Sequence, residues 1–412
     1  MDFDAFFSRN ARAMQPSPIR KMAALINAPG VISFAGGVPS PATFPDEDLR
    51  VILDEIVRAD GYKIFQYGVT RGLEEFRSLL VEILAKRHIR ASVDQLMITT
   101  GSQQGLELLS RILLDPGDVV LVELPSYVGA LACFRNCLAD MAGVAQDGDG
   151  IVPEELARVA DRLQREGRRV KMLYVIPNFQ NPSGITITPE RRGQILEIAA
   201  ARNILVVEDD PYGDMYFEGQ DPGRLRPVKA FPGGESVVYL GSFSKVVCPG
   251  LRTAFLAAPE PVVQKLDLAK QAADLCSSSL DQRLVFEYCR RGHYDRHLGE
   301  VRRFYDGKCQ VMLAALERHM PPGVRWTRPK GGMFVWLTLP AGLDAETLAI
   351  EAVRDLKVAF IHGAPFFVDG SGADTLRFTF AKEGTDKIEE GLRLLGAFFS
   401  RKIEAAGDRG RP

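Results

Sequence analysis

One lysine and a few polar residues around it are of the types that could carry chemistry together. Lys245 ends the run Gly241-Ser242-Phe243-Ser244-Lys245, and Arg252 follows seven residues later. Upstream, Asn181 lies in Asn-Pro-Ser-Gly and Asp209 in Glu-Asp-Asp-Pro-Tyr. In this order they offer an amine for a Schiff base, a cation for a phosphate, a donor for a phenolate oxygen and an anion for a pyridinium ring. Pyridoxal phosphate chemistry requires these groups. A single lysine is usually a solvated surface charge, and the combination argues against that reading for Lys245.

The elements that must position these residues alternate between apolar runs and helical stretches from about residue 95 to 260. Continuous apolar runs are typical of strands buried on both faces. Their alternation with helices predicts an α/β fold with a mainly parallel, doubly wound sheet. The predicted strands are 96–99, 119–122, 172–176, 204–208, 237–240 and 253–257, and the predicted helices include 103–114, 153–165 and 189–201.

Two helices precede this region, and a smaller α+β unit follows it. Apolar residues recur at helical spacing in 46–58 and 71–87. The chain of 412 residues is long enough to favour two domains. Residues 401–412 are polar and are predicted to be frayed. The predicted later elements are helices at 294–319, 344–354 and 386–399 and strands at 333–339, 358–361 and 376–380.

The candidate residues follow predicted strands. Asn181, Asp209 and Lys245 each come shortly after one, and in an open α/β sheet ligands bind outside the carboxyl ends of the strands. We therefore expect them to meet at one edge of the sheet. The run Thr100-Gly101-Ser102-Gln103 follows a strand and opens a helix, which favours an anion such as phosphate. Taken singly, each feature has an ordinary explanation: a helix cap for Asp209, a turn for Asn181 and a strand–helix connection for the glycine turn.

Composition argues against several other classes of function. Hydrophobic residues make up 46% of the chain, charged residues 25%, and the net charge is −2, which is typical of a soluble enzyme. There is no basic block, so neither nucleic acid nor an anionic membrane is an expected partner. Apolar runs are strand-sized and no signal peptide is recognisable, so we expect a cytoplasmic protein. Six scattered cysteines without a Cys-x-x-Cys pair predict free thiols.

Other catalytic patterns are weak or absent. His293 and His297 are four residues apart on a predicted helix, as zinc ligands can be, but no Glu follows the first His. A solvated helix face is favoured, and no metal is expected. The sequence contains no Gly-x-Ser-x-Gly elbow of a serine hydrolase. It also lacks Gly-x-Gly-x-x-Gly and Walker motifs at the glycine turn.

As a set, the motifs resemble the fold type I pyridoxal-phosphate aminotransferases, and within them the kynurenine/2-aminoadipate aminotransferase group. The resemblance covers about residues 17 to 395. It implies a large cofactor-binding domain at 46–305, a smaller C-terminal domain at 306–412 and an N-terminal segment, 1–45, that covers the active site. The motifs are Phe34-Ala-Gly-Gly-Val-Pro, Gln66-Tyr67-Gly, Gly101-Ser-Gln-Gln-Gly, Pro177-Asn-Phe-Gln-Asn-Pro-Ser-Gly, Glu208-Asp-Asp-Pro-Tyr, Gly241-Ser-Phe-Ser-Lys, Pro249-Gly-Leu-Arg and Leu376-Arg-Phe.

The resemblance also implies a role for each matching residue. Lys245 would form the Schiff base and Asp209 would pair with the pyridine nitrogen. The ring would be held by Asn181, Tyr212 and Tyr127, and the phosphate by Ser102, Gln103, Ser242, Ser244, Arg252 and, from the second subunit of a homodimer, Tyr67. Arg377 would bind the substrate α-carboxylate near the Gly37 backbone. Arg20 either binds a side-chain carboxylate of the substrate or is an ordinary surface residue.

The implied activity is transfer of an amino group between an L-amino acid and a 2-oxo acid. The donor would be 2-aminoadipate or an aromatic or aliphatic amino acid, and the acceptor 2-oxoglutarate. A pyridoxal-phosphate lyase is one alternative, because cofactor binding is shared across the fold. A regulator that binds the cofactor without catalysis is the other. It would need a long DNA-binding extension, for which the sequence before Phe34 is too short.

Overall fold

The computed structural model describes residues 1–16 and 28–409. Within them, the largest sheet has eight strands in the order β2-β9-β8-β7-β6-β3-β4-β5. The five strands from β8 to β4 run parallel, β9 is antiparallel to both of its neighbours, and β5 is antiparallel to β4. The strands are β2 (Leu96–Thr100), β3 (Val119–Leu124), β4 (Asp140–Asp147), β5 (Gly150–Ile151), β6 (Val170–Val175), β7 (Leu205–Asp209), β8 (Val238–Ser242) and β9 (Thr253–Ala257).

The predicted α/β class and mainly parallel sheet are confirmed. The antiparallel direction of β9 was not predicted. It follows from the short connection between Ser242 and Thr253, because a parallel pair needs a crossover of about a dozen residues or more.

Alternate residues of the central strands face two helical layers. In β3, Val120 and Val122 belong to the core cluster that contains α6 (Gly101–Leu113) and α7 (Val128–Asn136). Val119 and Leu121 belong to the cluster that contains α8 (Pro153–Arg165) and α9 (Pro189–Ala201). Successive side chains of a strand point to opposite faces, so both faces of β3 are covered, which explains its continuous apolar sequence.

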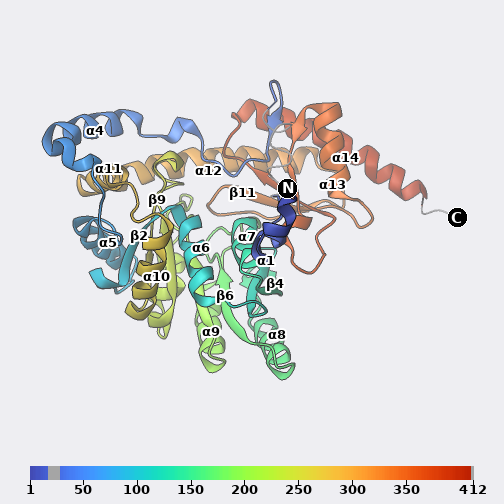
Figure 1. Cartoon of the computed structure of the whole chain (residues 1–412). Coiled ribbons are helices and arrows are strands. Elements are labelled where there is room, and N and C mark those ends of the chain that lie inside the picture. The colour runs from blue at the N-terminus through green and yellow to red at the C-terminus, as the bar shows by residue number, and fades with distance from the viewer. Residues whose placement is uncertain (17–27, 410–412) are drawn as a thin grey trace.

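Further helices surround this sheet. The predicted helices 46–58 and 71–87 are α4 (Asp46–Asp60) and α5 (Glu74–Lys86). Two helices at the same end were not predicted, α10 (Glu260–Ala273) and α11 (Ser279–Arg290). The long helix α12 (His293–His319) runs across the top of the molecule, from the side of α11 to that of α14 (Figure 1).

The C-terminal part has its own antiparallel sheet in the order β10-β11-β14-β13. Its strands are β10 (Arg325–Trp326), β11 (Phe334–Thr338), β13 (Ile361–His362) and β14 (Thr375–Thr379). The predicted strand 358–361 is instead two strands, because β12 (Val358–Ala359) leaves this sheet to pair with β1 (Ile32–Ser33). The predicted helix 344–354 is α13 (Ala345–Glu351), which continues as a π-helical turn.

The prediction that residues 401–412 fray was wrong for the described part. Helix α14 (Thr385–Arg409) continues past residue 400. Lys402 pairs with Glu351 and lies over the ring of Phe398, and Ile403 packs against the core. These contacts hold a stretch whose own sequence is polar.

The N-terminal segment is tied to the rest of the fold. Asn10, which lies in α1 (Arg9–Ala13), donates to the carbonyl of Asn136 at the end of α7. Farther along the segment, β1 pairs with β12. The division at 45 and 305 stays a prediction, and the second boundary falls inside the continuous helix α12. In the described residues, no helix is both long and apolar enough to span a bilayer.

Candidate active site

A cleft of about 660 Å³ opens where β3, β6, β7 and β8 end. It brings together most of the predicted residues: Gly37, Ser102, Gln103, Tyr127, Asn181, Asp209, Tyr212, Ser242, Ser244, Lys245, Arg252 and Arg377. Two predicted residues are not among them. Tyr67 lies outside this cleft with 81% of its surface exposed. Arg20 falls in 17–27, outside the described residues.

Lys245 lies in the cleft just after β8. Its Nζ donates to the carbonyl of Gly37 at 3.0 Å. Removal from water and, to a smaller extent, the neighbouring cations Arg377 and Arg252 together lower the pKa of Lys245 to about 8, against the opposite effect of Asp209. A lysine with this pKa supplies a free amine near neutral pH, as a nucleophile or a base requires.

Asp209 ends β7 and is 3% exposed. One carboxylate oxygen, Oδ2, accepts from the hydroxyl of Tyr174 at 2.8 Å. The other, Oδ1, is buried and has no hydrogen-bond partner in the described protein. Burial raises the pKa of Asp209 to about 7, opposed by the bond from Tyr174. A buried acceptor without a partner is uncommon in proteins and is suited to the N–H of a bound ring.

An anion site lies at the start of α6. Gly101 has φ +75°, and a Cβ there would collide with the guanidinium of Arg252, so the absence of a side chain lets Arg252 lie over the helix N-terminus. The Oγ of Ser102 is buried and has no partner among the described residues, and the Oγ of Ser242 accepts from the Ser244 amide at 3.2 Å. A helix N-terminus next to a guanidinium favours a phosphate.

At the other end of the cleft lies Arg377 on β14, which is 2% exposed. Its Nη1 donates to Asn181 Oδ1 and its Nη2 to the carbonyl of Ala35, both at 2.8 Å, while Nε has no partner in the described protein. The guanidinium carbon lies 4.4 Å from the centre of the Phe334 ring. Burial lowers the pKa of Arg377 to about 10, which leaves it cationic at neutral pH. Its planar fork suits a carboxylate.

Tyrosines flank the space between these ends. Tyr127 donates to Gln103 Oε1 at 3.3 Å, and Gln103 in turn donates to the carbonyl of Gly129 at 3.0 Å. Burial raises the pKa values of Tyr127, to about 12, and of Tyr212, so both hydroxyls are neutral donors. Tyr212 packs edge-on to Phe334 with ring centres 5.9 Å apart.

This arrangement fits pyridoxal phosphate. The unpartnered Asp209 Oδ1 would accept from the ring nitrogen, and the unpartnered Ser102 Oγ would donate to the phosphate beside Arg252. Asn181 and Tyr212 would hold the ring oxygen, and Lys245 would supply the amine. When bound, the cofactor supplies a ring that withdraws electrons from the substrate Cα.

Comparison with known proteins supports pyridoxal phosphate as the cofactor. Residues 31–395 match the family described as aminotransferase class I and II. The chain belongs to this family. It is 38% identical to aromatic-amino-acid aminotransferase 1 of Thermococcus litoralis, over 98% of this chain and 96% of that protein.

Two solved aminotransferase structures are similar over almost all of both chains. Kynurenine aminotransferase of Pyrococcus horikoshii, in complex with PMP and kynurenine, has a TM-score of 0.93 and 38% identity, covering 98% of each chain. The α-aminoadipate aminotransferase LysN of Thermus thermophilus, complexed with N-(5'-phosphopyridoxyl)-L-leucine, has a TM-score of 0.89 and 40% identity, covering 98% of this chain and 100% of that one. The predicted fold type I, pyridoxal phosphate cofactor, transaminase class and likeness to this group are confirmed.

Tyr174 was not among the predicted site residues of this aminotransferase. The residue is fully buried in β6 and touches Asp209 directly. Its sequence context, Met172-Leu-Tyr-Val-Ile, predicts only a strand. The one available signal was a hydroxyl in an otherwise apolar run, because such a group needs a partner when buried.

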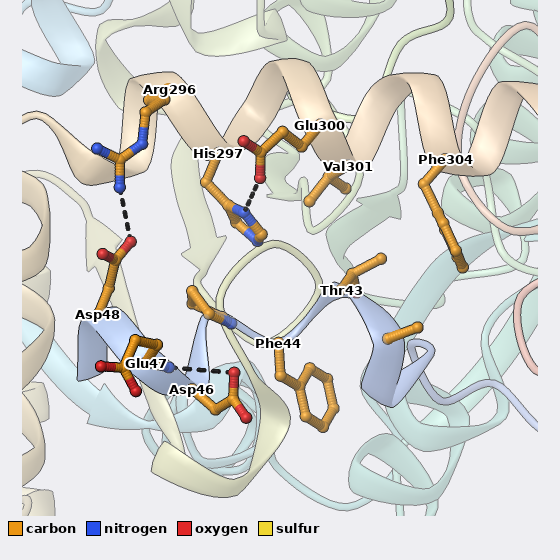
Figure 2. A pocket seen from close by; sticks show the side chains of 12 residues that line it. Thr43, Phe44, Asp46, Glu47, Asp48, Arg296, His297, Glu300, Val301 and Phe304 are labelled. Carbon is orange, nitrogen blue, oxygen red and sulfur yellow. Dashed lines mark hydrogen bonds and ion pairs between the residues drawn. The ribbon is translucent and has the colours of Figure 1, made fainter. Parts of the chain in front are cut away.

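His293 and His297 contact carboxylates and an aromatic ring in the structure. A second cleft of about 460 Å³ lies between residues 42–48 and α12. Figure 2 shows His297 beside Glu300 and Arg296 reaching Asp48. The Nδ1 of His297 lies 3.4 Å from Oε2 of Glu300. His293 also faces Asp48, and its ring stacks on Tyr288. Among the described residues, no group of three or more His, Cys, Asp or Glu side chains could hold a metal ion.

Proposed function

We propose that this aminotransferase moves the amino group of an L-amino acid, namely 2-aminoadipate or an aromatic or aliphatic amino acid, to 2-oxoglutarate. The two half-reactions follow one another at one site, in a ping-pong sequence. The observation that carries the proposal is that Lys245, with its lowered pKa, and the buried guanidinium of Arg377 share one cleft with Asp209.

In this proposal each residue of the cleft has one task. Lys245 first binds the cofactor covalently and, once displaced by the substrate amine, accepts the proton that leaves the substrate Cα. Arg377 holds the α-carboxylate and so directs the Cα–H toward Lys245. Asp209 stays opposite the ring nitrogen, where its charge stabilises the protonated ring. The phosphate ligands keep the cofactor in place between half-reactions.

The described residues that line the cleft support amino acids with neutral side chains as substrates. Apart from Lys245, Arg252 and Arg377, the residues that line the described part of the cleft include no lysine or arginine. Apolar residues face the same space, namely Val38, Leu106, Val128, Ala132 and Pro249. An acidic side chain would need a further cation, and Arg20 is the candidate from the sequence.

The two half-reactions should be separable. An amino acid alone should convert the bound cofactor to its pyridoxamine form, and a 2-oxo acid should restore it, because one site holds both substrates in turn. The absorption spectrum of the bound cofactor follows each step, and 2-oxoglutarate with a panel of amino acids identifies the donors. Ammonia released from a single substrate would point to a lyase. A cofactor that binds but never changes form would point to a regulator.

We also propose a homodimer with shared active sites, as supported by an apolar surface on residues 51–69. Several large side chains there are exposed, which is unusual for a surface without a partner. They are Val51, Leu53 and Val57 on α4, followed by Tyr62, Phe65, Tyr67 and Val69. In the dimer, the hydroxyl of Tyr67 would extend from this surface and donate to the phosphate bound by the partner chain.

Hybrid dimers test this arrangement. A Lys245→Ala chain paired with a Tyr67→Phe chain keeps one intact site, so the mixture should be more active than the mean of the two separate proteins. With random pairing, about a quarter of all sites should be intact. Lys245→Ala paired with Arg377→Ala is the matched control, since both residues lie in the same chain's cleft and no hybrid site is intact. A fully active monomer in sedimentation at assay concentration would contradict the dimer.

A cytoplasmic location is part of the proposal. It is supported by the cysteines, all six of which are free thiols in the structure.

A further inference from the structure

Tyr174 is buried beneath the cleft, and nothing proposed above assigns it a task. It lies in β6 directly opposite Val207 of the parallel neighbour β7. Asp209 is two residues beyond Val207, so it faces the same side of the sheet as Tyr174. The ring of Tyr174 packs edge-on against Phe134, with centres 5.7 Å apart. These contacts fix where the hydroxyl points, 2.8 Å from Asp209 Oδ2.

The Tyr174 hydroxyl makes the two carboxylate oxygens of Asp209 different, because it engages only one of them. Burial raises the pKa of Tyr174 far above its ordinary value, so the hydroxyl remains a donor. The terminal torsion of an aspartate is soft, and a carboxylate without fixed partners can turn either oxygen to a neighbour. With Oδ2 engaged by Tyr174, only Oδ1 is left without a partner in the described protein.

The hydrogen bond from Tyr174 is one of the few interactions that favour the ionised form of Asp209. Burial and the neighbouring Asp210 raise the pKa of Asp209, whereas the Tyr174 hydroxyl and the Lys245 ammonium lower it. Tyr127 and Tyr212 also face the carboxylate and remain neutral. Once Lys245 gives up its charge, Tyr174 is the main described group that favours ionised Asp209.

We infer that Tyr174 is a positioning residue of the cofactor site: its hydroxyl holds Oδ2 of Asp209, leaves Oδ1 for the ring nitrogen of the cofactor and keeps the carboxylate an acceptor. This inference rests on the proposed role of Asp209. It assigns to a residue of the apolar strand β6 part of the control over ring protonation.

Tyr174→Phe removes the hydroxyl and keeps the ring packing. A hydrogen bond to a charged group is worth about 1.5–3 kcal/mol, so the apo-protein should bind pyridoxamine phosphate about ten- to a hundredfold more weakly. This probe lacks the aldehyde and cannot link to Lys245, so calorimetry reports the non-covalent site alone. The pH at which Asp209 ionises should also rise in the variant, because a group that stabilises the charged form is lost. The low-pH edge of the binding profile should therefore move to higher pH.

Tyr288→Phe is the matched control. Tyr288 is equally buried and its hydroxyl has no partner in the described protein, so the variant should bind the probe with unchanged affinity and pH profile. An unchanged affinity and profile in Tyr174→Phe as well would overturn the inference.

Asp209→Asn separates this inference from the proposed function. If Asp209→Asn weakens probe binding and Tyr174→Phe does not, only the role of Tyr174 is wrong. If neither variant changes binding, the role of Asp209 is wrong as well. In the Asp209→Asn background, Tyr174→Phe should add less than it does alone, because the two residues act through one hydrogen bond. Independent, additive losses would show a structural effect and would overturn the inference.

Discussion

Lys245→Ala should lose the covalent link to pyridoxal phosphate and lower kcat by about ten-thousandfold or more. One side chain carries two tasks in the proposed mechanism, as nucleophile toward the cofactor and as base at the substrate Cα. Removing a general base alone typically costs about a hundred- to ten-thousandfold in rate. The expected loss is at the upper end because no other described amine lines the cleft.

Borohydride reduction followed by peptide mapping locates the link. The reduced cofactor should be attached to Lys245 and not to Lys229. Lys229 is a matched control, since burial also lowers its pKa to about 8. Its Nζ, however, lies outside the cleft and donates to the carbonyls of Glu235 and Val237. Labelling of Lys229 or of any other lysine in place of Lys245 would show that the assignment is wrong.

The same lysine sets the pH dependence of reconstitution. Only the neutral amine attacks the cofactor aldehyde, and its fraction rises about tenfold per pH unit below the pKa. With the pKa of Lys245 lowered to about 8, the rate of link formation should rise up to about pH 8 and then level off. Stopped-flow absorption at several pH values gives this profile. A rate that continues to rise toward the ordinary lysine pKa would contradict the lowered value.

Much of the cleft was predictable because its residue types are specific and follow strands. Lys245, Asn181 and Asp209 each have an ordinary explanation alone, but few functions need all three at the ends of parallel strands. The structure brings them into one cleft. Arg377 was different, because a single arginine in a short strand carries no local signal and only the resemblance to a family marked it.

The features that sequence did not predict depend on long-range contacts. Tyr174 meets Asp209 only through the register between β6 and β7. The polar end of α14 is held by Lys402 and Glu351, far apart in the chain. Local composition contains none of this information, which arises when the strands and helices pack.

Arg377→Ala should weaken catalysis for every amino acid, because every substrate has the α-carboxylate that Arg377 would bind. Loss of a buried, charged, bidentate contact typically costs about 2–5 kcal/mol, which is about thirty- to several-thousandfold in kcat/KM. The variant also removes the donor to Asn181 Oδ1. The spectrum of the bound cofactor and the Tm must therefore be compared with wild type, so that a distorted cofactor site is not mistaken for lost substrate binding.

Arg20→Ala should affect only part of the substrate range. If Arg20 binds a side-chain carboxylate, kcat/KM should fall for glutamate and 2-aminoadipate and stay unchanged for leucine and phenylalanine, since neutral side chains can contact the apolar residues that line part of the described cleft. Arg12→Ala is the matched control, because Arg12 belongs to the same N-terminal segment, its guanidinium donates to the Asp4 carbonyl at 2.9 Å, and it is not among the residues that line the cleft. All four substrates are compared on the same variant, so a general folding defect would lower kcat/KM for all four together. Equal losses for acidic and neutral substrates would make Arg20 a structural residue, and the second carboxylate would then have to be bound by another group.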